Sequence, residues 1–274
     1  MYTPFGFILR KTLILLFGNK QLRMNRPQGK AIIMGASSGI GLEVARILLH
    51  DGWTLGLAAR RLAPLQALQR QYPNNAFIAQ IDVNDAEADA QLQALISQMG
   101  GDINLYVHVA GIGWQNPDLQ SAEEIATMQT NAVGFTRMLG AAFRYFAKRE
   151  GGGHIAAITS IAGTRGLGQA PAYSASKALQ NTYLEALSQL AHMRHLPIVI
   201  TDLRPGFVRT PLLGESTHYP MLMQPAMVAQ RIVRAIYRKK SVCVIDYRWR
   251  LLTALWSLIP HWLWRKMSIR TKEV

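Results

Sequence analysis

The sequence predicts an α/β fold, a Rossmann-like doubly wound domain in which helices cover both faces of a seven-stranded parallel sheet. Three observations carry this prediction. Short apolar runs alternate with helical stretches, a glycine-rich turn follows the first run, and 274 residues suit one large domain. Such apolar runs are typical of parallel strands that are buried on both faces. The predicted strands cover residues 31–36, 54–59, 76–83, 104–110, 154–160, 197–203 and 241–246, and long helices are predicted at 121–149 and 171–192.

The glycine-rich turn lies between the first predicted strand and an amphipathic helix, and it reads Gly35-Ala-Ser-Ser-Gly39-Ile-Gly41. In such a turn Gly35 permits the tight bend, Gly39 lets the backbone approach a pyrophosphate, and Gly41 allows the helix to pack closely on the strand. The N-terminus of the helix adds free N–H donors for the anion. The segment therefore predicts a dinucleotide-binding site.

The second predicted strand ends at Ala59 and is followed by Arg60 and Arg61. A site for NAD usually has an acidic residue here, which binds the ribose 2′-hydroxyl. Two guanidinium groups instead suit a 2′-phosphate, because arginine binds phosphate with paired donors. We therefore expect the cofactor NADP(H). The alternative is that both arginines only begin the next helix in solvent.

Ser160 ends the fifth predicted strand, and Tyr173 and Lys177 follow on one helix, thirteen and then four further residues along. This spacing puts the phenol and the ammonium on one helix face. A phenol with an ordinary pKa of about 10 is a poor acid or base at neutral pH, and a nearby ammonium lowers that pKa. Tyr173 can then exchange a proton with a carbonyl or alcohol oxygen, while the Ser160 hydroxyl hydrogen-bonds the same oxygen. The three residues predict carbonyl–alcohol redox chemistry, with hydride carried by the cofactor.

With these motifs in this order, the chain resembles the short-chain dehydrogenase/reductase family over about residues 29–246. The resemblance implies that Asn131, Ser160, Tyr173 and Lys177 are catalytic. It implies that Asn131 holds a water that relays protons to the lysine, and that Lys177 also binds the nicotinamide ribose. Besides Arg60 and Arg61, the implied cofactor contacts are Gly35, Ser37, Ser38, Gly39, Ile40, Gly41, Asp82, Val83, Ala110, Gly111, Tyr173, Lys177, Pro205, Gly206, Val208 and Thr210.

The chain departs from the family pattern at two positions. Met34 stands where the family usually has threonine, and His108-Val-Ala110-Gly111 stands where it usually has Asn-Asn-Ala-Gly. In the family these polar groups brace the loop, so the departures bear on cofactor affinity more than on mechanism. His108 either replaces a lost donor or is a buried strand histidine.

The net charge of +14 lies at the two ends of the chain. Residues 1–30 hold six Lys/Arg and no acid, residues 231–274 hold eleven and two, and residues 31–230 hold thirteen and fourteen. Both basic ends are also apolar, which indicates a membrane surface and not nucleic acid as the partner. The predicted parts are a basic apolar extension at 1–28, an NADP-binding catalytic domain at 29–246 and a basic amphipathic tail at 247–274.

The apolar stretch of the tail is too short to span a bilayer. A narrow polar stripe runs along it, which leaves leucines and three tryptophans on the remaining surface. We expect an interfacial helix on the cytoplasmic face of a membrane, kinked near Pro260. The alternative is a helix that covers the substrate pocket or contacts a second subunit. The stripe consists of Arg250, Thr253, Ser257, His261 and Arg265.

Two further features bear on the compartment. Cys243 is the single cysteine, which excludes an internal disulfide and suits a reducing cytoplasm, and we expect no metal site. The apolar stretch at 5–17 contains Arg10 and Lys11 and lacks a small-residue cleavage site, so it is expected to be a second anchor and not a secretory signal. Met24 is an alternative start.

Residues 211–225 take the place of the family's substrate lid and are largely apolar. Together with Trp114 and Leu167 they favour a small apolar substrate, although the methionines of this segment could instead pack on the core. Our interpretation is a cytoplasmic or membrane-peripheral reductase of a ketone or aldehyde. The alternatives are an NADP-linked alcohol dehydrogenase and a non-catalytic NADPH-binding protein. Assembly into a homo-oligomer stays open. The apolar residues of the lid are Leu212, Leu213, Met221, Leu222 and Met223.

Overall fold

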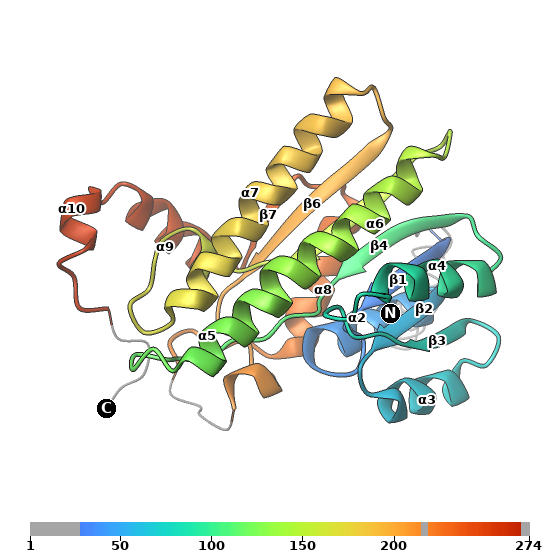
Figure 1. Cartoon of the computed structure of the whole chain (residues 1–274), viewed down its shortest axis with the longest axis horizontal. Coiled ribbons are helices and arrows are strands. Elements are labelled where there is room, and N and C mark those ends of the chain that lie inside the picture. Colours follow the sequence, from blue (N-terminus) through green and yellow to red (C-terminus); the bar gives the residue numbers. More distant parts are fainter. Residues whose placement is uncertain (1–27, 215–218, 270–274) are drawn as a thin grey trace, which may run out of the picture.

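The computed structural model describes residues 28–214 and 219–269 of the chain (Figure 1). Its strands are β1 (Lys30–Met34), β2 (Thr54–Ala59), β3 (Ala76–Gln80), β4 (Ile103–His108), β5 (Gly153–Ile158), β6 (Ile198–Pro205) and β7 (Val242–Ile245). They form one seven-stranded sheet in the order β3-β2-β1-β4-β5-β6-β7, and every neighbouring pair is parallel. This confirms the predicted fold class. Nearly all of the predicted N-terminal extension lies outside the described residues.

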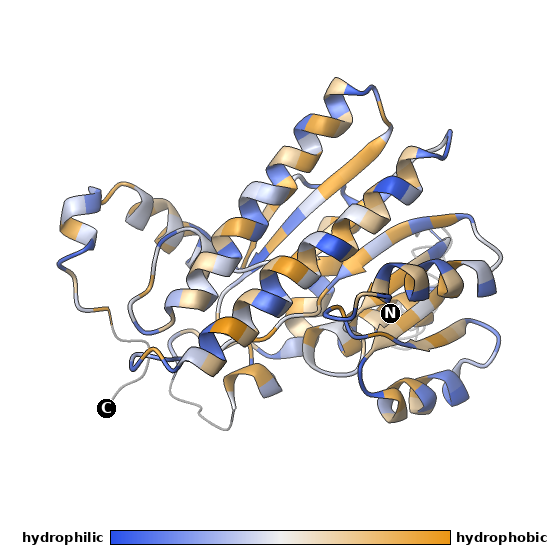
Figure 2. Cartoon of the chain, in the orientation of Figure 1, coloured by the Kyte–Doolittle hydropathy of each residue, from blue (hydrophilic) through white to orange (hydrophobic). Residues whose placement is uncertain are grey.

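Helices cover both faces of the sheet. One layer contains α2 (Gly39–His50), α3 (Leu62–Gln71) and α8 (Pro225–Tyr237), and the other contains α4 (Ala88–Gln98), α6 (Phe135–Ala147) and α7 (Pro171–Met193). Alternate strand residues serve the two faces: Ile33 of β1 is buried under α2 and α8, and Ile32 is buried under α4 and α6. Figure 2 shows the resulting apolar strands and the apolar stripes on the helices. The core therefore consists of two clusters, one on each side of the sheet.

Three other helices lie nearer the ends of the strands. α5 (Ser121–Met128) leads through a π-helical segment, Gln129–Gly134, into α6, so the long helix predicted at 121–149 contains a widened turn. α9 (Tyr247–Ser257) and α10 (His261–Trp264) follow β7 and lie to one side of the sheet (Figure 1).

Five of the predicted strands end one to three residues earlier than their sequence suggested, and two of these early ends bear on the site. The edge strand β3 stops at Gln80, because its neighbour β2 also ends there, at the pair Ala59 and Gln80. Asp82 and Val83, predicted inside this strand, therefore lie in the turn that follows it. Ser160 likewise lies two residues beyond the end of β5. After β3 the apolar residues Ile81 and Val83 continue the pattern past the last strand pairing.

The carboxyl ends of the parallel strands lie at one edge of the sheet. The winding of the sheet reverses between β1 and β4. β1 lies between β2 and β4, so the chain moves outward from β1 to β3 and then returns to the other side of β1. Ligands of doubly wound sheets bind outside the strand ends at this switch point. The glycine loop leaves β1 and Ser160 follows β5 at the same edge, so the two predicted motifs lie at one end of the molecule.

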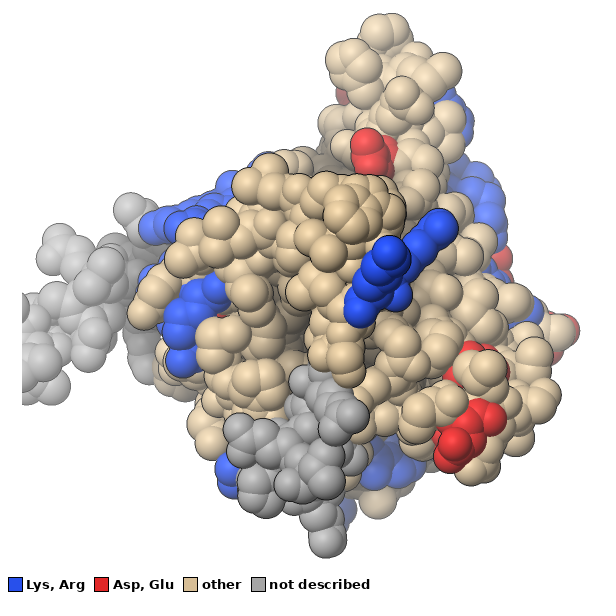
Figure 3. Space-filling model, turned by 90° about the vertical axis from the view of Figure 1, so that its left-hand side faces the viewer, with Lys and Arg blue, Asp and Glu red and all other residues tan. Residues whose placement is uncertain are grey.

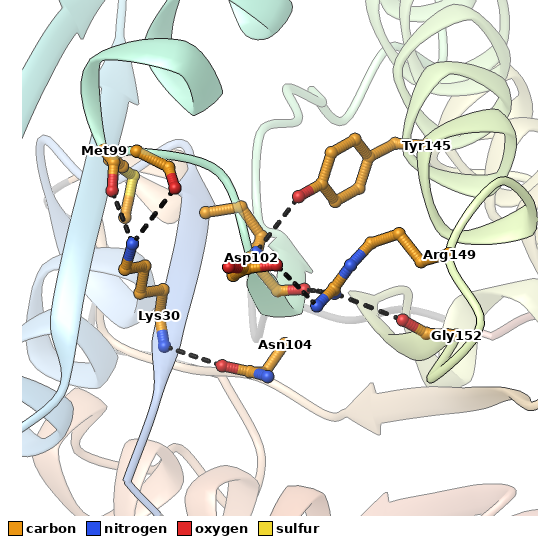
Figure 4. A network of polar contacts seen from close by, with 9 residues as sticks. Lys30, Met99, Asp102, Asn104, Tyr145, Arg149 and Gly152 are labelled. Carbon is orange, nitrogen blue, oxygen red and sulfur yellow. Dashed lines mark hydrogen bonds and ion pairs between the residues drawn. The ribbon is translucent and has the colours of Figure 1, made fainter.

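A polar network holds the opposite end of the sheet (Figure 4). Lys30 Nζ donates to the Met99 carbonyl at 2.7 Å, and the Tyr145 hydroxyl accepts from the Ile103 backbone N at 3.1 Å. Arg149, just after α6, donates to the Gly152 carbonyl at 3.2 Å and also to the Ile103 carbonyl. These contacts tie the starts of β1, β4 and β5 together and leave the carboxyl edge free for the site.

Candidate active site

The loop after β1 is shaped to receive a pyrophosphate. Gly35 has φ of 98° and Gly39 has φ of 54°, left-handed values that favour glycine. A Cβ atom on Gly35 would come within 2.6 Å of Ala110 N, and one on Gly41 within 2.2 Å of the Gly35 oxygen. The loop, which also contains Ser37, Ser38 and Ile40, therefore needs bare backbone at its glycines. α2 begins here with no acidic residue in its first turn, so its N–H groups fit an anion.

Arg61 reaches back to this loop. Its Nη2 donates to Ser38 Oγ at 2.9 Å and to Ser37 Oγ at 3.2 Å. Arg61 directly precedes α3, as the alternative explanation supposed, yet its side chain turns to the glycine loop and not away from it. Arg60 is exposed, and its carbonyl accepts from Gln80 Nε2 at 3.0 Å. A cation therefore stands at the rim of the pyrophosphate loop.

The segment after β6 crosses to the same loop. β6 ends at Pro205, and the buried Val208 forms a parallel bridge with Met223. A Cβ atom on Gly39 would lie 3.0 Å from the Thr210 methyl carbon, so the Thr210 side chain packs against the Gly39 backbone. The structure thus brings Thr210 to the glycine loop, where the family resemblance implied a cofactor contact.

Asp82 and Val83, which the family resemblance implies as contacts to the adenine of the cofactor, lie in the turn after β3. Asp82 Oδ1 accepts from the Asn84 backbone N at 3.0 Å. The Val83 side chain is buried, and its carbonyl accepts from Arg137 Nη1 at 2.7 Å. This turn is therefore fixed both internally and to α6.

The two departures from the family pattern are braced by backbone and core contacts. The Met34 carbonyl accepts from Val109 N at 2.8 Å and from Ala110 N at 3.0 Å. His108 is buried, its Nδ1 lies 3.1 Å from the Tyr106 hydroxyl, and burial lowers its pKa to about 3. His108 is therefore a buried strand histidine that is neutral near pH 7.

Ser160 and Tyr173 meet at the catalytic edge. Ser160 Oγ accepts from Ala162 N at 3.0 Å, and the Ser160 side chain hydrogen-bonds the Tyr173 phenol. Burial raises the pKa of Tyr173, and the bond to Ser160 offsets part of that rise. Lys177 Nζ lies 5.7 Å from the centre of the Tyr173 ring. The prediction of a lowered Tyr173 pKa is therefore wrong in its net direction, because desolvation of the phenol outweighs the hydrogen bond with Ser160.

Lys177 is buried one helical turn beyond Tyr173. Its Nζ donates to Gln180 Oε1 at 2.9 Å and to the Ile158 carbonyl at 3.3 Å. Burial lowers the pKa of Lys177 to about 8, and the carboxylate of Asp202 on β6 acts in the opposite direction. A Cβ atom on Gly111 would lie 3.7 Å from Lys177 Nζ, so the backbone after β4 passes beside the ammonium.

Asn131 lies fully buried in the π-helical segment. Its Oδ1 accepts from Ile112 N at 2.9 Å, and its Nδ2 donates to the Ile112 carbonyl at 2.6 Å and to Ser176 Oγ at 3.1 Å. The side chain thus fastens the loop after β4 to α7. Its backbone carbonyl accepts from Gln180 Nε2 at 2.8 Å, a contact that sequence reasoning did not anticipate.

Two more residues that position Tyr173 carried no recognised sequence signal. Gly113 packs on the tyrosine ring so closely that a Cβ atom there would come within 2.2 Å of Tyr173 Cδ2. Glu124 of α5 accepts from Ala172 N at 3.1 Å, at the start of α7, and from Asn116 Nδ2 at 2.9 Å. A carboxylate is favourable at a helix N-terminus, so Glu124 helps to fix the first turn that carries the phenol.

The tail packs against the loop that follows Ser160. Trp256 Nε1 donates to Thr164 Oγ1 at 3.0 Å, and Trp264 Nε1 donates to the Gly166 carbonyl at 2.8 Å. Arg165 Nη2 donates to the carbonyls of Ile259, Ser257 and Trp256 at 2.6, 2.9 and 3.3 Å. A cavity of about 550 Å³ lies between residues 166–169 and residues 261–269. The inner side of the tail therefore covers the active-site loop.

The observed tail differs from the predicted one in its kink and in its polar stripe. Two helices replace the one kinked helix, with Pro260 directly before α10. Thr253 of the predicted polar stripe is buried, and two of the three tryptophans, Trp256 and Trp264, face the protein. Trp249 is buried against Phe207 and Gly206, so the packed core continues past residue 246.

The outer side of the tail stays apolar and exposed. Its exposed large side chains include Leu258 at 78% and Trp262 at 64% exposure, with Leu251 and Leu255 beside them in α9. No helix in the described part of the chain is both long enough and apolar enough to cross a membrane.

Some residues of the predicted substrate lid pack in the core, and others lie exposed at the surface. Met223 is almost completely buried in the core, and Met221 packs partly buried against the same cluster, so the alternative of core packing holds for these two methionines. Leu212 and Trp114 remain exposed at 41% and 43%. Residues 215–218 of the lid lie outside the described residues.

A pyrophosphate cradle and a proton-transferring phenol at one edge of the sheet serve a single reaction, so fold and site together define an oxidoreductase that uses NAD(P). The chain belongs to the short-chain dehydrogenase/reductase family, since the short chain dehydrogenase model matches residues 29–220. An uncharacterized oxidoreductase of Mycobacterium tuberculosis is 32% identical over 249 residues, which cover 87% of this chain and 97% of that protein.

More distant relatives extend the similarity. The mouse dehydrogenase/reductase SDR family member 7B is 26% identical, over 88% of this chain and 81% of its own length. Among solved structures, an alcohol dehydrogenase of the archaeon Thermococcus sibiricus superposes with a TM-score of 0.70 at 24% identity, over 80% of this chain and 96% of that one. This last similarity reflects a shared fold.

Proposed function

We propose that this protein transfers hydride between NADP(H) and a carbonyl or alcohol group, chiefly to reduce a ketone or aldehyde on an apolar molecule. The observation that carries the proposal is the hydrogen bond between the buried Ser160 and the half-buried Tyr173, with the Lys177 ammonium beside it. A bound nicotinamide would supply the hydride to the carbonyl carbon. Tyr173 gives its phenolic proton to the carbonyl oxygen, and Ser160 donates a hydrogen bond to that oxygen as negative charge develops there.

The raised pKa of Tyr173 favours its role as a proton donor. A phenol that burial keeps protonated at neutral pH holds the proton that reduction consumes. In the reverse direction, the phenolate would have to form in a buried site. The ammonium of Lys177 would then stabilise that phenolate, which is how the same residues support both directions.

NADP(H) is the proposed cofactor because Arg61 stands at the rim of the glycine loop. Its guanidinium is exposed and can exchange two serine hydroxyl partners for phosphate oxygens, which it binds with paired, charge-assisted donors. The related archaeal alcohol dehydrogenase is described as complexed with 5-hydroxy-NADP, which supports the same choice.

The direct test is a turnover assay of the purified protein with NADPH or NADH and a series of ketones and aldehydes of increasing chain length. We expect NADPH oxidation that improves with apolar chain length. Tyr173→Phe should lose this activity and still bind NADPH, because it lacks only the proton-donating oxygen. NADPH binding without turnover of any carbonyl or alcohol would leave a non-catalytic binding protein and overturn the proposed reaction.

We further propose that the protein works at an anionic membrane surface. Residues 247–269 contain four Lys/Arg residues and no acid. Figure 3 shows the face of the molecule where α9 and α10 lie. It is largely uncharged, with basic side chains near its middle and left, and acidic ones toward the right and top. Exposed leucines can enter the headgroup region while the cations attract anionic lipid, at about 1 kcal/mol for each nearby basic residue.

Cosedimentation with anionic and with neutral vesicles tests the membrane proposal. We expect binding to anionic vesicles that weakens in high salt and is lost when Leu251, Leu255 and Leu258 are all changed to glutamine. The double change Leu190→Gln and Met193→Gln is the matched control, since it removes exposed apolar side chains at the far end of α7. The protein remaining in the supernatant at low salt would refute the proposal. A dimer that the triple variant dissociates would identify the surface as a subunit contact instead.

A further inference from the structure

A buried amide joins two members of the predicted catalytic set. Gln180 lies one turn after Lys177 on α7 and is fully buried. Lys177 Nζ donates to Gln180 Oε1 at 2.9 Å, and Gln180 Nε2 donates to the Asn131 carbonyl at 2.8 Å. The result is a continuous chain of hydrogen bonds from the ammonium through the amide to the backbone of the π-helical segment.

The neighbouring groups fix the orientation of this amide. An ammonium has only donors and a carbonyl only acceptors, so the Gln180 oxygen must face Lys177 and its nitrogen must face Asn131. The side chain of Asn131 is already engaged by Ile112 and Ser176. The other bond of the ammonium, to the Ile158 carbonyl, is longer at 3.3 Å. Gln180 is therefore the closer of the two hydrogen-bond partners of the ammonium.

The chemistry of an amide limits what this chain can do. An amide accepts and donates hydrogen bonds, but at neutral pH it neither gains nor loses a proton. A water molecule between the same groups could pass a proton in either direction. The link from Lys177 to Asn131 therefore orients charge and does not conduct protons.

We propose that Gln180 is a positioning residue for the reaction assigned above, because its amide holds the Lys177 ammonium in place against the carbonyl of Asn131. This proposal rests on the proposed function, in which Lys177 is the cation of the reacting site and of the cofactor ribose. Gln180 acts through Lys177 and contacts none of the reacting atoms.

Several charged and titratable groups lie close to Lys177 and influence its pKa. Asp202 faces it from β6 and favours the ammonium, while the buried His108 on β4 and the half-buried Tyr173 on α7 lie beside it. Burial leaves Lys177 with a pKa of about 8, within the range where a protein can be titrated without unfolding. A change of charge at Gln180 should therefore move a measurable titration.

Gln180→Glu and Gln180→Leu separate positioning from packing. The glutamate keeps an acceptor next to Lys177 and adds a negative charge, whereas leucine removes both hydrogen bonds at similar volume. Gln189→Glu and Gln189→Leu are matched controls on an exposed position of the same helix. The measurement is the dissociation constant of NADPH for the whole chain between pH 6 and 10, by nucleotide fluorescence, with thermal unfolding to verify that each variant is folded.

For the unchanged protein we expect NADPH affinity to fall as pH rises through about 8, as Lys177 loses its charge. Gln180→Glu should move this fall to higher pH by about one unit or more, because an opposite charge favours the ammonium. Gln180→Leu should move it to lower pH and weaken binding at pH 7 about tenfold. Gln180→Asn is the replacement if either of the other variants fails to fold. Its side chain is too short to reach both partners, so it should behave like the leucine variant.

An unshifted pH dependence and unchanged affinity in the folded variants would overturn the role of Gln180 while leaving the proposed function intact. A protein that binds no NADPH at any pH would overturn the proposed function, and the role of Gln180 with it.

Discussion

Arg165 is expected to hold the tail on the active-site loop, and its removal should free α10 without unfolding the domain. Its Nη2 contacts three carbonyls at the break between α9 and α10, and its guanidinium lies 5.5 Å from the centre of the Trp264 ring. Two N–H groups on Nη2 serve those three carbonyls, so we count two charge-assisted hydrogen bonds. Arg165→Ala removes both of them and the ring contact.

The magnitude follows from these contacts. A hydrogen bond to a charged group contributes about 1.5–3 kcal/mol, and an exposed cation–π contact about 0.5–1 kcal/mol. The low values sum to about 3.5 kcal/mol, and solvent screening of the half-buried guanidinium lowers this further, so we expect the tail to lose about 2–3 kcal/mol. That loss makes local opening roughly 30- to 150-fold more frequent.

Amide hydrogen exchange measures this opening directly. The amides of Leu263, Trp264 and Arg265 are hydrogen-bonded in α10 and should exchange faster by that factor in Arg165→Ala. Amides of the central strand β4 should not change. Arg194→Ala, at an exposed position beyond α7, is the control. Unchanged exchange in α10, or an equal increase in β4, would refute this account of how the tail is held.

Three further variants test other parts of the site. Tyr173→Phe should reduce turnover by at least about 100-fold with NADPH affinity nearly unchanged, as measured by steady-state kinetics and nucleotide fluorescence; retained turnover would contradict the mechanism. Gly113→Ala should displace the Tyr173 ring, and urea unfolding should show a loss of about 1–3 kcal/mol together with lost activity; an active, equally stable variant would contradict the close contact. Lys177→Met should be more stable relative to the native chain below pH 8 than above it. In the folded chain the pKa of Lys177, about 8, lies below its ordinary value, so between these two pH values the unfolded chain binds more protons. The native chain therefore gains stability as pH rises through this range, by on the order of 3 kcal/mol. A stability difference that does not vary with pH would contradict the depressed pKa.

The sheet and the main motifs could be predicted because each rests on local sequence patterns. Buried parallel strands require short apolar runs, and the glycine loop requires residues without a side chain at fixed spacing. These constraints act within a few residues of one another. The ends of β3 and β5 could not be read in this way, because a strand ends where its neighbour stops pairing, as at Ala59 and Gln80.

The supporting parts of the site depend on contacts between distant segments. No local sequence pattern marks Gly113 or Gln180. Gly113 acquires its role only when the loop after β4 packs against α7, and Gln180 only when α7 packs against the π-helical segment. The tail shows the same limit. Its apolar residues fitted either a membrane surface or a cover over the substrate pocket. Only the position of the loop after Ser160 decides that Trp256 and Trp264 face inward.

The glycine loop also has a consequence for the order of events during protein synthesis. Gly35 N bonds to the Ala58 carbonyl of β2, and the Met34 carbonyl is held by Val109 and Ala110 at the end of β4. The loop therefore leaves the ribosome well before the strands that shape it, and the neighbouring Thr210 is made later still. A dinucleotide cannot assist the early nascent chain, because its cradle does not yet exist. It can stabilise only the nearly completed domain, so cofactor supply should affect the yield of finished protein and not the first steps of folding.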